Sequence, residues 1–104
     1  MKHKVNLDDV IHEKNRLLIL SFLLKADELS FNDLKELTGL TDGNLVSHLK
    51  ILEEHKIIEV KKSFLGRKPR TTYKFTALGR KRFSDYLEAL KDFLNEISKE
   101  EQNG

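Results

Sequence analysis

Two short helical patterns that meet at a glycine limit the fold of this 104-residue chain more than any other feature. In the first, Ser30 stands as an N-cap with an acidic residue three positions later, and Gly39 occupies the expected left-handed C-terminal position. In the second, Thr41 is the N-cap of a segment that reaches about residue 55. Its apolar residues recur at helical spacing (Leu45, Leu49, Leu52). Two helices joined by a turn of about three or four residues around a glycine form a helix-turn-helix unit.

The basic residues of the chain are concentrated in one segment. Nine of the 19 lysines and arginines lie between residues 61 and 84, and all 17 acidic residues lie elsewhere. The net charge of +2 therefore does not show how polarised the molecule is. Nucleic acid is the commonest polyanionic partner for such a segment, and a solvated basic face without a partner is the alternative.

A hairpin is expected within this basic segment. Residues 57–62 and 70–75 are predicted to form two strands, because β-branched and aromatic residues alternate with polar ones. Residues 63–69 contain a glycine and a proline and are too basic to be buried, which predicts a loop. The tip of this hairpin carries three cationic side chains (Arg67, Lys68, Arg70).

Longer apolar patterns lie on either side of these elements. A first helix is expected from about residue 9 to residue 25, and its second half is apolar around most of its circumference. A last helix, capped by Thr76 and covering residues 77–99, carries an apolar stripe at steps of three and four. Such stripes pack within the chain or against a second copy, and we expect a mixture of both. The residues expected at a homodimer interface are Val10, Ile11, Leu18, Phe83, Tyr86, Leu87, Leu90, Phe93, Leu94 and Ile97.

Several stretches of the sequence carry a resemblance to a known family. They are residues 15–20, 34–40, 45–52, 66–73 and 75–80. In this order they resemble the winged helix-turn-helix transcriptional regulators of the MarR and ArsR type, with a one-residue difference in where serine falls in the recognition helix. The resemblance implies a mainly α fold with a small β-hairpin, a winged helix-turn-helix with an additional long C-terminal helix. The cysteine-rich metal motifs and long inserted helices of some relatives are absent, so neither metal sensing nor an effector pocket carries over.

The resemblance also implies how the chain contacts double-stranded DNA. The recognition helix, residues 42–55, would enter the major groove, and the wing, residues 63–70, would lie on the adjacent backbone or minor groove. Asn44 is suited to pair with adenine and Ser47 to bond several bases, with plain solvent exposure as the alternative for both. The residues expected to contact DNA are Thr41, Gly43, Asn44, Val46, Ser47, Lys50, Arg67, Lys68, Arg70 and Thr72.

These observations lead to one main hypothesis and one alternative. We expect a single winged helix domain over residues 1–104 that binds DNA as a homodimer in the cytoplasm and regulates transcription, most simply as a repressor. The alternative is a winged-helix protein–protein interaction module without direct DNA binding. Whether a small-molecule effector is needed is left open.

Other functions are excluded by what the sequence lacks. It contains no cysteine and no catalytic motif, so we expect neither an enzyme nor a cofactor. The histidines show no metal-ligand spacing, and no metal site is expected; His48 is expected to be a packed, hydrogen-bonded side chain. The longest apolar stretch, residues 17–24, is too short to cross a bilayer.

Overall fold

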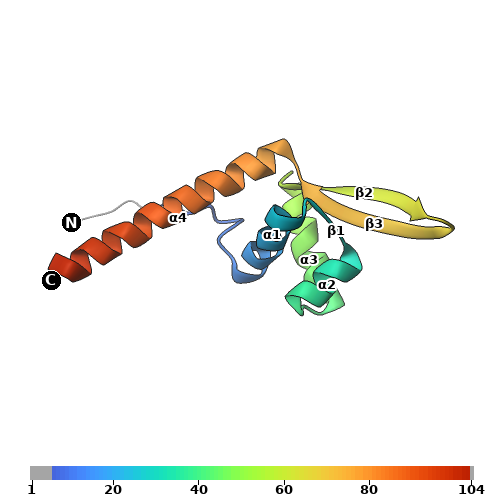
Figure 1. Ribbon diagram of the computed structural model, residues 1–104, viewed down its shortest axis with the longest axis horizontal. Coiled ribbons are helices and arrows are strands. Elements are labelled where there is room, and N and C mark those ends of the chain that lie inside the picture. Colours follow the sequence, from blue (N-terminus) through green and yellow to red (C-terminus); the bar gives the residue numbers. More distant parts are fainter. Residues whose placement is uncertain (1–5, 104) are drawn as a thin grey trace.

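Within residues 6–103, which the computed structural model describes, the chain forms four helices and three strands (Figure 1). In chain order these are α1 (Lys14–Ala26), β1 (Glu28–Ser30), α2 (Phe31–Thr38), α3 (Asp42–Glu54), β2 (Ile58–Leu65), β3 (Lys68–Phe75) and α4 (Ala77–Asn103). The strands form one antiparallel sheet in the order β1-β3-β2. The expected mainly α fold, with a β-hairpin and a long last helix, is confirmed.

The helix caps and the turn of the helix-turn-helix unit form as the sequence predicts. Ser30 Oγ accepts the backbone N–H of Asp33 at 3.1 Å, and the Asp33 carboxylate accepts the N–H of Ser30 at 3.2 Å. This is a complete capping box. Gly39 ends α2 with a φ of 70°, and Thr41 starts α3 by accepting the N–H of Asn44 at 3.3 Å.

The hydrophobic core lies where the three shorter helices meet the sheet and the first turns of α4. Its buried residues are Ile11, Ile19, Leu20, Leu23, Leu34, Leu45, Leu49, Leu52, Ile57, Ile58, Phe75, Phe83 and Tyr86. The three leucines of α3 are at most 3% exposed, so its predicted buried face is confirmed. The opposite face of α3 is thereby turned toward solvent.

The first helix begins later than its apolar pattern predicts, at Lys14 rather than at residue 9. The Glu13 carboxylate caps it and accepts two backbone N–H bonds from its first turn, at 3.0 and 2.8 Å. Upstream, the Asp8 carboxylate accepts the N–H of Val10 at 3.0 Å and that of Ile11 at 3.2 Å. These local bonds form a turn that competes with helix formation, so the helix does not extend into this segment.

The hairpin is longer than the sequence predicts, and the expected loop over residues 63–69 is wrong. The strands pair continuously up to a two-residue turn, in which Gly66 has a φ of 66°, as the first central position of a type II′ turn requires. Pro69 pairs with Phe64 and is tolerated in β3 because β1 reaches only as far as Thr72. The sequence pattern also misses β1, because three residues are too few to show alternation.

The long helix α4 leaves the body at one end of the molecule, and the hairpin leaves it at the other (Figure 1). Together they give the chain a longest dimension of 62 Å. Phe83 and Tyr86 at the base of α4 are each 2% exposed, and Ile11 is fully buried beside them. These three residues therefore pack within the chain, which corrects their expected place at a dimer interface. Farther along α4, Leu94 is 54% exposed and Ile97 is 43% exposed.

Candidate nucleic-acid interface

The outward face of α3 presents a row of small and polar side chains. All six positions that the sequence predicts here are exposed: Thr41, Gly43, Asn44, Val46, Ser47 and Lys50. Val46 is 53% exposed, although it is apolar. Hydrogen-bonding groups and one apolar side chain therefore share the outward face of a helix, an element that the major groove of DNA admits.

The acidic residue at the start of α3 is neutralised by its neighbour on α2. The Asp42 carboxylate lies 2.8 Å from the ammonium group of Lys35, and both side chains are exposed. Because Thr41 already supplies the N-cap, Asp42 is not needed for that role. The ion pair reduces the repulsion that a free carboxylate would exert on a phosphate.

The β2–β3 ribbon carries a cluster of positive charge that is not neutralised within the described part of the chain. Five basic side chains on it are exposed and form no ion pair with any carboxylate of residues 6–103: Lys61, Lys62, Arg67, Lys68 and Arg70. The other four basic residues of the segment each pair with a carboxylate (Lys74 with Glu59, Arg80 with Asp27, Lys81 with Asp85, Arg82 with Asp8). The unpaired cations therefore lie on the outer part of the ribbon, and the paired cations lie at the base of the ribbon and in the first turns of α4.

One predicted contact does not fit this surface. The Thr72 side chain is 4% exposed, and its hydroxyl donates a hydrogen bond of 2.6 Å to the Glu28 carboxylate on β1. The pairing of β1 with β3 covers this position. Thr72 therefore joins two strands, which corrects its expected role as a DNA contact.

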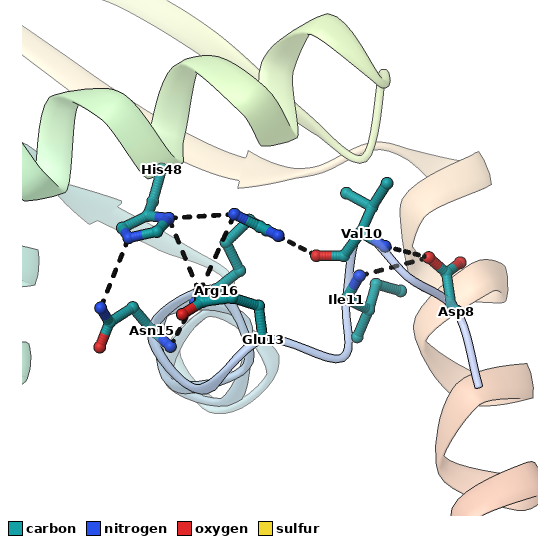
Figure 2. A network of polar contacts seen from close by, with 7 residues as sticks. All are labelled: Asp8, Val10, Ile11, Glu13, Asn15, Arg16 and His48. Atoms are coloured by element: carbon teal, nitrogen blue, oxygen red, sulfur yellow. Dashed lines mark hydrogen bonds and ion pairs between the residues drawn. The ribbon is translucent and has the colours of Figure 1, made fainter.

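A network of polar contacts connects α3 to α1 (Figure 2). Arg16 Nη1 donates to His48 Nδ1 at 3.2 Å, and the Asn15 amide lies 3.4 Å from Nε2 of the same ring. Arg16 also donates through Nε to the Val10 carbonyl at 2.6 Å, and its guanidinium lies 3.9 Å from the Glu13 carboxylate. His48 is thus a packed and hydrogen-bonded side chain, which confirms the prediction for it. The network fixes the rotation of α3 about its axis.

The same network continues to α4 through the N-terminal segment. The Asp8 carboxylate, which holds the turn before α1, also accepts two hydrogen bonds from the Arg82 guanidinium. Burial alone raises the pKa of Asp8, but these bonds, the backbone N–H groups and the charge of Arg82 together hold the pKa below its usual 3.8. For Glu13, burial likewise acts to raise the pKa, and the N–H bonds from Arg16 and Asn15 outweigh it.

These two carboxylates predict a loss of stability in acid. Their pKa values are lowered by folding, so their stabilising contribution is complete above the unfolded-state values and is lost as the pH falls through the folded-state values. Urea unfolding followed by circular dichroism should give a constant free energy of unfolding down to about pH 5 and a decrease below it.

The variant Asp8→Asn serves as the control for this prediction. It is expected to destabilise the protein by about 1–2 kcal/mol at neutral pH, because it weakens the contact with Arg82. It should also reduce the decrease of stability in acid. An unchanged acid dependence in this variant would contradict the role of Asp8.

Comparison with known families identifies the fold formed by α3, the ribbon and the helices around them. Residues 15–94 match the family model described as a winged helix DNA-binding domain, from α1 through most of α4. The chain belongs to the winged helix DNA-binding domain family. The resemblance that the recognition helix and the wing suggest is confirmed.

Individual relatives agree with the winged helix assignment. A protein of Methanocaldococcus jannaschii, described as uncharacterized, is 44% identical over 72 residues, which is 69% of this chain and 78% of that protein. The structure of a transcriptional regulator homologue from Pyrococcus horikoshii OT3 is 30% identical, with a TM-score of 0.80 over 85% of this chain and 87% of that one. A structure from Enterococcus faecalis V583, described as a MarR-family regulator, shares the fold at 18% identity, with a TM-score of 0.73 over 99% and 100% of the two chains.

The winged helix also contains features that sequence reasoning did not find. The contacts of Arg16 with His48 and of Asp8 with Arg82 join residues that are far apart along the chain, and no local spacing signals them. Among residues 6–103, no group of three or more histidine or acidic side chains is arranged to hold a metal ion. In the same part of the chain, no helix has the length and apolar character needed to cross a membrane.

Proposed function

We propose that this winged helix protein binds double-stranded DNA as a homodimer and represses transcription by occluding a promoter. In this proposal α3 enters the major groove, where Asn44 and Ser47 read base edges and Val46 meets a thymine methyl group. Gly43 allows the backbone to approach closely, and Thr41 with the N-terminal amides of α3 binds a phosphate. Lys50 contacts the phosphate backbone.

One observation carries this proposal: five exposed cations without an ion pair to a described carboxylate gather on the ribbon that follows α3. The ribbon begins four residues after the end of α3, and its basic side chains point into solvent. Arg67, Lys68 and Arg70 surround its tip, where they are suited to a phosphate backbone or a narrow minor groove. A helix with a polar outer face next to such a ribbon is suited to contact both grooves of one duplex.

A salt titration tests the proposal directly. Fluorescence anisotropy with a labelled random-sequence duplex should show tight binding at low salt and a slope of log affinity against log salt of about −5 or steeper. Such a slope is expected if five or more phosphates are neutralised by lysines and arginines. Absent or salt-independent binding would overturn the proposal and favour the protein-docking alternative.

The dimer is proposed from the apolar side chains that α4 leaves exposed. Leu87, Leu94 and Ile97 are 39%, 54% and 43% exposed and recur at helical steps along the projecting part of α4. Leu90 and Phe93 are partly buried on the same stripe, and Leu18 of α1 and Val10 are exposed or half-buried in the body. Burial of this stripe against a second copy would place two recognition helices on successive major grooves, about 10 base pairs apart.

Charged substitutions on the stripe should separate the subunits. Leu94→Glu combined with Ile97→Glu is expected to convert the dimer to a monomer, because two carboxylates would be buried without partners. Sedimentation or light scattering measures the mass, and operator affinity should fall together with dimer content. Asn95→Glu is the matched control, since Asn95 is exposed on α4 beside Leu94 but lies off the stripe. A double variant that keeps the mass of a dimer would contradict the interface.

A further inference from the structure

The far end of the β2–β3 ribbon is apolar as well as basic. Phe64 is 73% exposed and Leu65 is 66% exposed, and they are the two most exposed large hydrophobic side chains among the described residues. Neither residue belongs to the hydrophobic core or packs against it. A soluble surface rarely carries adjacent apolar residues of this size without a use for them.

The ribbon presents these side chains as a protruding edge. Phe64 is paired with Pro69 across the two strands, so both lie on one face of the ribbon, and Leu65 lies on the other face beside Lys68. The third strand ends its pairing at Thr72 and covers neither face at the tip. Figure 1 shows the ribbon extending away from the helices, with its turn at the end of the molecule. The apolar tip is therefore free to enter a narrow space.

The charges around the tip indicate the kind of partner. The five unpaired cations of the ribbon flank the tip on both faces: Lys62 lies on the face of Phe64, Lys61, Lys68 and Arg70 lie on the face of Leu65, and Arg67 lies in the turn. No acidic residue lies between positions 61 and 84. An apolar edge with cations on both faces of the ribbon is complementary to a groove with a polyanionic rim and stacked, apolar bases inside. Proteins that bind the minor groove insert phenylalanine, leucine or proline between base pairs in this way, and the duplex bends toward the major groove.

We propose that Phe64, supported by Pro69 and Leu65, is an apolar wedge that enters the minor groove and opens a base step. This inference rests on the proposed DNA binding and adds a source of sequence preference to it. Pyrimidine–purine steps such as TA unstack most easily, so the wedge favours them without contacting a base edge. A ribbon that acted by charge alone would favour A-tracts instead, because their narrow minor groove attracts arginine.

Two duplexes separate these mechanisms without knowledge of the operator. One is an alternating TA duplex of about 30 base pairs, with an easily opened step in every register, and the other is an A-tract duplex of the same length. The wild-type protein is expected to bind the alternating duplex about tenfold more tightly. It should also bend that duplex, measured by energy transfer between its ends, and increase the fluorescence of 2-aminopurine placed at central steps.

The variant Phe64→Ala tests the wedge itself. It should bind both duplexes with similar affinity and an unchanged salt dependence, and lose the bend and the 2-aminopurine signal. Phe64→Leu should restore part of the bend, because leucine is also an effective wedge. The high exposure of Phe64 makes misfolding of these variants unexpected, and thermal unfolding verifies this. Leu65→Ala provides a second, independent variant, expected to reduce the bend.

The outcomes distinguish failure of the wedge from failure of DNA binding. Salt-sensitive binding by the wild-type protein without bending, or with tighter binding to the A-tract, overturns the wedge alone. A Phe64→Ala variant that bends DNA as the wild type does also overturns it. If the wild-type protein binds neither duplex, the proposed function itself fails. Phe64-dependent binding to vesicles of an anionic phospholipid without any DNA bending would overturn the wedge in favour of a membrane surface.

Discussion

Replacing Arg67 and Arg70 together by alanine is expected to weaken DNA binding about a hundredfold or more near 0.1 M salt. Both side chains are exposed and form no ion pair with a described carboxylate, so their removal breaks no ion pair within the described residues. In a homodimer the change removes four cations from the interface. If each neutralises one phosphate, the slope of log affinity against log salt should become shallower by about 3 to 4.

The matched control removes the same charge elsewhere. Lys25 at the end of α1 and Lys99 on α4 are both exposed and lie outside the ribbon and the outward face of α3. Lys25→Ala combined with Lys99→Ala should change the affinity only slightly and leave the salt slope unchanged. Anisotropy titrations at several salt concentrations measure both double variants. Equal effects of the two pairs would show that net charge, rather than the wing, governs binding.

Replacing Gly79 by alanine is expected to destabilise the fold by about 3 kcal/mol or more. Gly79 is buried in the first turn of α4, and a Cβ atom there would lie 1.8 Å from the Ile57 carbonyl oxygen. That oxygen accepts the backbone N–H of Thr76 at 3.0 Å, which fixes the approach of α4 to the end of α3 and the start of β2. Relief of the overlap would require α4 to move away from the core.

Gly43→Ala is the control for this prediction. Gly43 lies in the first turn of α3, and a Cβ atom there would have nothing within 4 Å. Because alanine favours a helix over glycine, this variant should be neutral or more stable by up to about 1 kcal/mol. Urea unfolding of both variants measures the difference. Similar stabilities of the two variants would contradict the close contact at Gly79.

The helix-turn-helix unit was predictable because its signals are local. The cap at Ser30, the glycine at position 39 and the spacing of the α3 leucines act within one or two turns of chain, and each behaves in the fold as expected. The exposed face of α3 follows from its buried face by helical geometry alone. The cationic tip of the wing was equally visible, because it depends only on composition and a turn.

The start of α1 and the extent of the hairpin were less predictable. Apolar residues before Lys14 have the character of helix residues, yet the Asp8 carboxylate bonds the backbone of the residues after it and forms a turn. In the hairpin, glycine and proline suggested a loop, but Pro69 lies where β3 has no outer neighbour and therefore loses no bond. Local composition does not reveal which edge of a strand is free.

The local patterns of this chain therefore determine the helix-turn-helix unit, the position of the wing and the concentration of its charge, because each depends on neighbours within a few residues. Only the tertiary structure decides which cations are free, because Arg82 is neutralised by Asp8 from the other end of the chain. It also decides that Thr72 is buried under β1 and that Gly79 passes close to the Ile57 carbonyl. These outcomes depend on contacts between distant segments, for which the sequence carries no periodic signal.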